Sequence, residues 1–387
     1  MTIIRNGRVI RGGAIEAADI AFENGKIVPV PSEVSGAEII DAAGRYVAPG
    51  FVDIHTHGGG GCDFLDNTVD AFLTAAKLHA EHGTTTLLPT ATSGTPEETV
   101  GILAVSKEAA EVNVDGADMP GIHFEGPYFS PEQCGAQDPE MVRAPDPQEY
   151  EKILSLSDRI LRWSAAPELA GSREFAAALR EHGVLPSIGH SNAEYDEVVQ
   201  ALEDGFTHIT HLYSCCSTVH RRNAYRYAGI VESAYLLDGL TVEIIADGVH
   251  LPPPLLQQVY RFIGPDRTAL VPDSMRGAGM PDGKSVLGKR DNGLEVIIED
   301  GVAKLPDRSA FAGSVAFCDR LIRNIVNLAD VPIEDAVLMA TETPAKILGI
   351  KNKGVLKAGY DADIVIFDRD INICTNIVNG TIVYSAI

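Results

Sequence analysis

Apolar and polar positions follow two different rhythms along the chain. In its middle part, short apolar runs with strand-like composition alternate with segments in which apolar residues recur every three to four positions, the period of an amphipathic helix. Repeated alternation of strand and helix favours a parallel sheet. Eight such runs are present, the number that a closed (β/α)8 TIM barrel needs. They cover residues 51–54, 84–88, 121–124, 160–165, 185–188, 206–212, 240–246 and 268–271.

Most segments between these runs predict helices, and one predicts a hairpin. Residues 294–306, LEVIIEDGVAKLP, interrupt the rhythm and predict a hairpin inserted before the last helices. The helical pattern is clearest at residues 69–81, 96–112, 173–182, 192–204 and 253–262.

The two ends of the chain carry a different pattern. The runs TIIRNGRVI and IAFENGKIVPV at the start are β-rich, and each contains an Asn-Gly pair, which favours a tight reversal. The runs DADIVIFD and CTNIVNGTIVYS at the other end repeat this pattern. We therefore expect residues 1–48 and 350–387 to form one small β-sandwich domain, and residues 49–349 to form the barrel domain between them.

The composition of the chain argues against several kinds of binding partner and cellular location. Of the 387 residues 45% are hydrophobic, and 31 basic residues against 54 acidic ones leave a net charge of −23, which argues against nucleic acid or an anionic membrane as a partner. The chain lacks the ~18 consecutive apolar residues of a membrane span, and its start lacks the apolar core of a signal peptide, so we expect a cytoplasmic protein. The six cysteines show no CxxC spacing, and they signal neither a disulfide framework nor a cysteine zinc site.

Polar side chains terminate five of the eight predicted strands. In a barrel of this kind the carboxyl ends of the strands meet at one rim, where the chemistry takes place. Side chains alternate along a strand, so His55 and His57 point to one side, and Asp53 is expected to share it. An isolated His-x-His pair is a weak motif, but imidazoles together with carboxylates match the ligand preference of Zn²⁺ or Fe²⁺. The candidate metal ligands are His55, His57, Glu125, His190 and His211.

A metal at this rim indicates hydrolysis as the reaction class, because a bound divalent ion lowers the pKa of a water molecule to about 7 and polarises a carbonyl. Asp273, after the eighth run, is placed to accept the water's proton and pass it to a leaving amine; a turn aspartate in PDSM is the alternative. Asp53 is expected to support the ligands rather than to bind the ion. His208 lies three residues before His211, and we expect it to face the other way.

An ordered set of motifs resembles a known family. PGFVDIHTHG, GIHFEGPYFSPEQCGAQ, GHS, THLY, IADGVH, PDSM with GAGMPDG, FAGSV and KGVLKAGYDADIVIFD occur in the order found in the N-acetylglucosamine-6-phosphate deacetylases of the amidohydrolase superfamily. The resemblance covers nearly the whole chain. It implies a (β/α)8 barrel with a small β-sandwich built from both termini, a homodimer, and hydrolysis of an amide that releases acetate from an amino-sugar phosphate.

The resemblance also implies roles for single residues. Glu125, His190 and His211 match the family's principal metal site, and Asp273 matches its general base and acid. His55 and His57 match the pair that builds a second metal position in some members, so the chain is expected to bind one or two divalent ions, zinc or iron. Gln137 falls where members contact the substrate's acetyl carbonyl, and His250 matches a residue that contacts the sugar or its phosphate.

Two departures from the family pattern concern substrate binding. After the sixth run the family has HL(F/Y)NAM and then an arginine that reaches a phosphate, sometimes across the dimer, whereas this chain has a longer loop with Ser214, Cys215 and Cys216. Arg221, Arg222 and Arg226 offer replacement cations for a phosphate, or they form a solvated loop face. Arg276 stands where the family has a small residue, and it either grips an acidic group of the substrate or pairs with a nearby acid.

Three functions from different classes are therefore open. The first is deacetylation of N-acetylglucosamine 6-phosphate or of a related sugar, such as the galactosamine epimer or a non-phosphorylated or acidic sugar. The second is a cyclic amidohydrolase or deaminase, which is disfavoured because many of these enzymes bridge two metals with a lysine at a strand end and no lysine terminates any of the eight runs. The third is a metal-binding sensor that binds a sugar without turnover.

Overall fold

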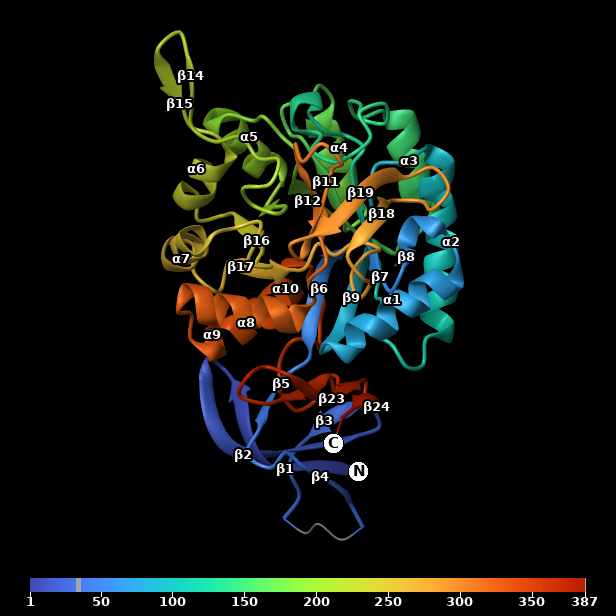
Figure 1. The fold of residues 1–387 in the computed structure, drawn as a ribbon, viewed down its shortest axis with the longest axis vertical. Coiled ribbons are helices and arrows are strands. Elements are labelled where there is room, and N and C mark those ends of the chain that lie inside the picture. The colour runs from blue at the N-terminus through green and yellow to red at the C-terminus, as the bar shows by residue number, and fades with distance from the viewer. Residues whose placement is uncertain (33–35, 387) are drawn as a thin grey trace.

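The computed structural model describes residues 1–32 and 36–386. The chain forms a barrel surrounded by helices and, below it, a smaller sheet in which the two ends of the chain meet (Figure 1). This arrangement confirms the predicted TIM barrel with a small β part built from both termini, while the exact domain boundaries remain a prediction.

Each of the eight predicted runs overlaps one strand of the barrel. The eight strands are parallel, and their order around the barrel is their order along the chain. They are β6 (Phe51–Thr56), β9 (Thr84–Ala91), β10 (Ile122–Glu125), β11 (Ile160–Ala165), β12 (Leu185–Ile188), β13 (His208–Ile209), β16 (Thr241–Ile245) and β17 (Thr268–Val271).

The first and last strands of the barrel meet beside the candidate site residues. Strands β6 and β17 stand at the two ends of the hydrogen-bonded order. The backbone N–H of Asp273 donates to the carbonyl of His55 at 3.0 Å, and that of His57 donates to the carbonyl of Ser274 at 2.8 Å. Closure of the cylinder therefore fixes the backbone of the candidate base beside the candidate metal ligands.

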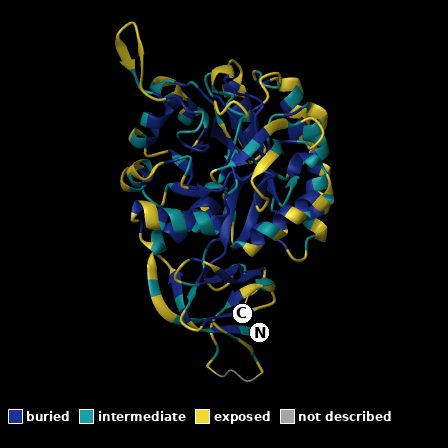
Figure 2. Cartoon of the chain, in the orientation of Figure 1, coloured by how far each residue is buried: buried dark blue, intermediate teal, exposed yellow. Residues whose placement is uncertain are grey.

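Helices cover the outside of the barrel, with buried inner faces and exposed outer faces (Figure 2). The sequence sets their ends. At the start of one helix the Thr95 hydroxyl accepts the backbone N–H of Glu98, the Glu98 carboxylate accepts the backbone N–H of Thr95, and Pro96 occupies the first helical position. The helices are α1 (Val69–Glu81), α2 (Pro96–Val112), α3 (Pro147–Leu156), α4 (Ser172–Glu181), α5 (Tyr195–Asp204), α6 (Ile230–Leu236), α7 (Pro253–Phe262), α8 (Cys318–Ala329), α9 (Ile333–Met339) and α10 (Glu342–Ile347), with 3₁₀ turns η1 (Phe64–Asp66) and η2 (Pro131–Gln133). In the described part of the chain, no helix has the length and apolar character needed to cross a membrane.

The terminal strands form one mixed sheet of eight strands around its own apolar core. Asn24-Gly25 and Asn379-Gly380 form tight reversals with positive φ, as predicted. The same prediction is wrong at Asn6-Gly7, where the positive φ of Asn6 accompanies a register shift inside strand β1 instead of a reversal. A Cβ atom at Gly7 would lie 2.6 Å from Val47, so this position needs glycine. The strands are β1 (Thr2–Arg11), β2 (Ala14–Glu23), β3 (Lys26–Val28), β4 (Glu38–Asp41), β5 (Tyr46–Pro49), β22 (Ile364–Phe367), β23 (Ile373–Val378) and β24 (Thr381–Ser385).

A buried ion cluster joins this sheet to the barrel. Lys353 is 7% exposed, and its Nζ lies 2.8 Å from Asp363 and 3.3 Å from Asp361 beside the small sheet. The same nitrogen lies 3.0 Å from Asp118, which precedes barrel strand β10. The two parts are thus tied together far from the strand ends that carry the site.

The described part of the chain forms three smaller sheets besides the barrel and the terminal sheet. The predicted hairpin of residues 294–306 is confirmed as β19 and β20 within a four-stranded antiparallel sheet beside the mouth. Another hairpin projects away from the body (Figure 1, top left). The sheets are β18 (Gly283–Leu287), β19 (Leu294–Glu299), β20 (Val302–Lys304) and β21 (Phe311–Ser314); β14 (His220–Arg222) and β15 (Tyr225–Tyr227); and β7 (Gly58–Gly59) and β8 (Cys62–Asp63).

Candidate active site

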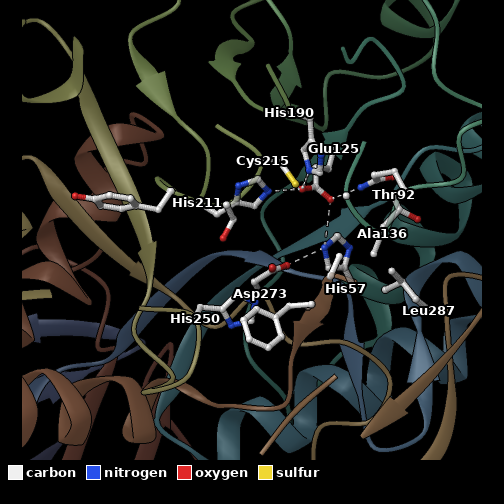
Figure 3. A pocket seen from close by; sticks show the side chains of 17 residues that line it. His57, Thr92, Glu125, Ala136, His190, His211, Cys215, His250, Asp273 and Leu287 are labelled. Atoms are coloured by element: carbon white, nitrogen blue, oxygen red, sulfur yellow. Dashed lines mark hydrogen bonds and ion pairs between the residues drawn. The ribbon is translucent and has the colours of Figure 1, made fainter. Parts of the chain in front are cut away.

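A cavity of about 340 Å³ opens at the carboxyl ends of the barrel strands. Its polar wall contains side chains that lie far apart in the sequence (Figure 3). Strands of the barrel bring them together, and β18 and β21 add the apolar residues Leu287 and Phe311 from one side. The predicted site residues that line it are His57, Glu125, Gln137, His190, His211, Ser214, His250 and Asp273.

Glu125, His190 and His211 form one candidate metal site. Oε1 of Glu125 lies 3.1 Å from Nε2 of His190 and 2.9 Å from Nε2 of His211, and all three side chains are buried. Glu125 ends strand β10, whereas His190 and His211 follow their strands with left-handed backbone, at φ of 48° and 28°. Such strained positions are typical of functional sites.

His55 and His57 form a second group around the same carboxylate. Nε2 of His55 lies 3.6 Å from Oε1 of Glu125, and Nε2 of His57 lies 3.4 Å from Oε2. Glu125 thus belongs to both candidate metal groups. One carboxylate shared by two sets of imidazoles can bridge two ions, each held by nitrogen and oxygen ligands.

The candidate base lies against the second group. Oδ1 of Asp273 is 3.0 Å from Nε2 of His57 and 3.4 Å from Nε2 of His55. Burial raises the pKa of Asp273, but the neighbouring imidazoles outweigh this effect and hold it below its usual value. The carboxylate is therefore ionised at neutral pH, as a proton acceptor must be.

The electrostatics of the site fit a divalent cation. Burial lowers the pKa of His55, but the surrounding carboxylates, led by Glu243, outweigh it and raise the pKa to about 10. The negative charge of these carboxylates therefore favours positive charge at the site. A divalent ion brings two positive charges to one point, whereas protons bring one charge to each imidazole. Nε2 of His55 is also a buried atom without a hydrogen-bond partner, which is a free ligand position aimed at Glu125.

Asp53 does not share the side of the two histidines, so that prediction is wrong. The pairing of β6 with β9 shifts register between Asp53 and Thr56, which breaks the alternation of side chains. Oδ2 of Asp53 instead lies 3.6 Å from Nδ1 of His79 on helix α1. Its other oxygen accepts the backbone N–H of His55 at 2.9 Å, and burial raises the pKa of Asp53 to about 7.

Gln137 and His250, the residues expected to contact the substrate, both line the cavity. Nε2 of Gln137 donates to Oε2 of Glu125 at 2.8 Å, and its Oε1 accepts the backbone N–H of Ser93, so the amide already has partners on both sides. Nδ1 of His250 lies 2.8 Å from Oδ2 of Asp247, which leaves Nε2 of this imidazole for a ligand.

The arginines expected to bind the substrate lie outside the cavity. Arg221 and Arg222 are exposed on the projecting hairpin, where Arg222 pairs with Glu194 at 2.9 Å. Arg276 is 6% exposed and forms two 2.7 Å hydrogen bonds to Asp66, with further bonds to backbone carbonyls. The structure thus favours the pairing of Arg276 with a nearby acid over a contact with substrate.

Cys215 lines the cavity wall, whereas Cys216 is buried behind it. A side chain at Gly135 would lie 2.5 Å from Sγ of Cys215, and φ at Gly135 is +58°, so the loop packs there only because it has a glycine. We find no metal group that includes either thiol among the described residues.

The sequence analysis missed two charged residues beneath the site. Glu243 and Arg162 are fully buried inside the barrel, 2.6 Å apart. The available signal was a charge in the middle of each strand-like run, TVEII and ILRWSA. The His208 side chain reaches Glu243 at 3.3 Å and the His211 side chain reaches Glu125 at 2.9 Å, and both carboxylates lie against His55. The prediction that these two histidines face opposite ways is therefore wrong, because the left-handed backbone at His211 breaks the strand's alternation.

Comparison with known proteins agrees with this geometry. Residues 46–384 match the model of the amidohydrolase family. The chain is 34% identical over 368 residues to the N-acetylglucosamine-6-phosphate deacetylase of Vibrio furnissii, covering 94% of this chain and 90% of that protein. It is 31% identical over 384 residues to the enzyme of the same name from Lysinibacillus sphaericus, covering 98% and 97%. The chain belongs to the N-acetylglucosamine-6-phosphate deacetylase family.

A solved structure of this family superposes on nearly the whole molecule. A mutant of N-acetyl-D-glucosamine-6-phosphate deacetylase from Mycobacterium smegmatis, in complex with N-acetyl-D-glucosamine-6-phosphate, matches with a TM-score of 0.89 and 30% identity, covering 99% of both chains. The resemblance of the motifs is thereby confirmed at the level of family and fold, and the chain is a hydrolase of the amide-cleaving class.

Proposed function

We propose that the protein removes the acetyl group of N-acetylglucosamine 6-phosphate by metal-dependent hydrolysis. The observation that carries this proposal is the position of Glu125 between two groups of imidazoles, with the ionised Asp273 3.0 Å from one of them. The names of the relatives support the amino-sugar substrate. They do not favour the cyclic amidohydrolase or deaminase alternative.

The residues of the chain divide the work of the reaction. Glu125, His190 and His211 would hold the principal ion, and His55 and His57 a second one. A zinc or iron ion held there would supply polarisation of the acetyl carbonyl and a lowered pKa of water. Asp273 accepts the proton of the attacking water and delivers it to the sugar nitrogen as the C–N bond breaks. The products are acetate and the free amine.

Side chains around the cavity orient the substrate. The free nitrogen of His250 is available to a sugar hydroxyl or a phosphate oxygen, and Ser214 also offers a hydroxyl to the cavity. Nε2 of Gln137 donates one of its two hydrogens to Glu125, so the other can donate to the acetyl carbonyl. The apolar wall of Leu287 and Phe311 excludes water from the opposite side.

The 6-phosphate needs a cation that the cavity lining does not provide. We propose that the hairpin β14–β15 supplies it to a second copy of the chain in a homodimer, because the hairpin carries Arg221, Arg222 and Arg226 and projects away from its own barrel (Figure 1). We expect this dimer to act in the cytoplasm.

An acetate-release assay tests the function directly. Protein of measured metal content is incubated with N-acetylglucosamine and N-acetylgalactosamine, each with and without a 6-phosphate. We expect the highest kcat/KM on the phosphorylated glucosamine form. Sugar binding without acetate release on any substrate would instead support a sensor, and ammonia release from a nucleobase would support a deaminase.

A further inference from the structure

Glu243 lies beneath the candidate metal centre, and both of its carboxylate oxygens have polar partners. It is 0% exposed on strand β16. Its Oε1 lies 2.6 Å from Nδ1 of His55 and accepts the backbone N–H of His211 at 3.1 Å. Its Oε2 accepts from Arg162 at 2.6 Å and lies 3.3 Å from Nε2 of His208. One carboxylate therefore touches a residue of each candidate metal group.

The hydrogen bond to His55 determines which ring nitrogen is free. An ionised carboxylate can only accept, so Nδ1 of His55 must carry the proton. In the neutral ring, Nε2 then has its lone pair available. This nitrogen has no hydrogen-bond partner and faces Glu125 at 3.6 Å and Asp273 at 3.4 Å. A carboxylate behind a ligating imidazole fixes both the tautomer and the orientation of the ring.

Arg162 makes this carboxylate stable in the interior. Its side chain is 0% exposed, and it donates to Ser187, Thr210 and the carbonyl of Ile54 as well as to Glu243. A buried carboxylate is costly unless it is paired and hydrogen-bonded. The guanidinium thus pairs with Oε2 of Glu243 and leaves Oε1 to His55.

We propose that Glu243, held by Arg162, is a positioning residue that presents Nε2 of His55 to a second metal ion. The proposal rests on the metal centre of the proposed deacetylase, but not on its substrate. Glu243 touches neither the cavity nor the reacting atoms, so it acts only through His55 and through the backbone of His211.

Replacement of Glu243 by glutamine has a defined effect on the tautomer. The amide oxygen of E243Q is expected to stay with the cation of Arg162, which turns the amide NH2 toward His55. Nδ1 of His55 must then accept a hydrogen bond, the proton moves to Nε2, and this nitrogen can no longer bind an ion. The same NH2 faces the backbone N–H of His211, which loses its acceptor, but the contacts of the His190 and His211 side chains with Glu125 are not altered by the substitution.

The test measures the affinity for each ion rather than activity. Chelator-treated protein is titrated with Zn²⁺ against a competing chelator, and bound zinc is counted after equilibrium dialysis. We expect the wild type to bind two ions, and E243Q to bind the second about 10- to 100-fold more weakly. We expect binding of the first ion to change much less. The double variant E243Q/H55N is expected to lose no more affinity than H55N alone, because both changes remove the same ligand.

Two controls separate positioning from folding. D363N removes an equally buried carboxylate that pairs with Lys353 in the small sheet, and it is expected to bind both ions as the wild type does. R162M/E243L removes the cation together with the acid and leaves Nδ1 of His55 without the carboxylate acceptor, so it keeps the test usable if E243Q does not fold. A wild type that binds a single ion, unchanged second-ion affinity in the folded variants, or additive losses in the double variant would overturn the proposal. Two bound ions without acetate release would refute the proposed function and leave this inference standing.

Discussion

Nε2 of His57 lies 3.0 Å from Oδ1 of Asp273, although the two residues come from opposite ends of the barrel sequence. The closure of the barrel between β6 and β17 creates this contact, because Asp273 N–H is bound to the carbonyl of His55. A candidate metal ligand and the candidate base therefore share one edge of the cavity. This relationship leads to the first prediction.

Asp273→Asn should stop catalysis without emptying the principal metal site. The amide cannot accept a proton at neutral pH, so we expect kcat to fall by about 10²- to 10⁴-fold. The ion at Glu125, His190 and His211 should remain bound, because Asp273 is not a member of this candidate metal group. Steady-state kinetics and metal analysis on the same sample check this prediction. A variant with full activity would refute the assigned base.

Removal of metal should destabilise the protein as well as inactivate it. An ion that binds only the folded state adds about 2.7 kcal/mol to the free energy of unfolding at a hundredfold excess over its Kd. We therefore expect a lower Tm after dialysis against a chelator and recovery when Zn²⁺ or Fe²⁺ is returned. His190→Asn removes one ligand of the principal site, so its Tm should respond much less to the chelator. An equal response of the variant would place the stabilising ion elsewhere.

Substitution of the hairpin arginines should affect phosphorylated substrates only. Arg221 and Arg226 lie opposite each other on β14 and β15. If they hold the 6-phosphate of a second subunit, R221A/R226A should raise KM for the phosphorylated sugar about tenfold or more, the value of a lost hydrogen bond to a charged group. KM for the unphosphorylated sugar should not change. R173A, an exposed arginine on helix α4, is the matched control.

Arg276 should contribute to stability rather than to substrate affinity. It is bound to Asp66 through two hydrogen bonds, so Arg276→Ala leaves a partly buried carboxylate without its charged partner and should cost about 2 kcal/mol. KM should stay within about twofold of the wild type, because the guanidinium does not line the cavity. Chemical denaturation and kinetics on the same variant check this. A large rise in KM with unchanged stability would restore the substrate-binding role.

The stabilisation by this pair should also depend on pH in a definite direction. Burial raises the pKa of Asp66, but the hydrogen bonds from Arg276 outweigh it and hold the pKa below 3.8. A group with a lowered folded pKa stabilises the protein above its unfolded pKa and loses this effect as the pH falls through the folded value. The difference in unfolding free energy between wild type and Asp66→Asn should therefore be constant from about pH 8 to pH 5 and shrink below about pH 4. A difference that grows with falling pH would contradict this assignment.

The sequence by itself determined the barrel, its strand ends and the type of chemistry. Strand and helix periods are local properties, and parallel strands in a barrel place their carboxyl ends at one rim, so the convergence of Glu125, His190 and His211 could be predicted without coordinates. The alternation of side chains likewise placed His55 and His57 together.

Only the tertiary structure decided how individual side chains face and pair. The register shift after Asp53 and the left-handed backbone at His211 break the alternation on which strand predictions depend, and neither is visible in the local pattern. The pairing of Glu243 with Arg162, like that of Arg276 with Asp66, joins residues far apart in the chain. A local sequence pattern indicates which backbone conformations have a low free energy. The partner of a buried charge is decided only when strands that are distant in the chain pack around it.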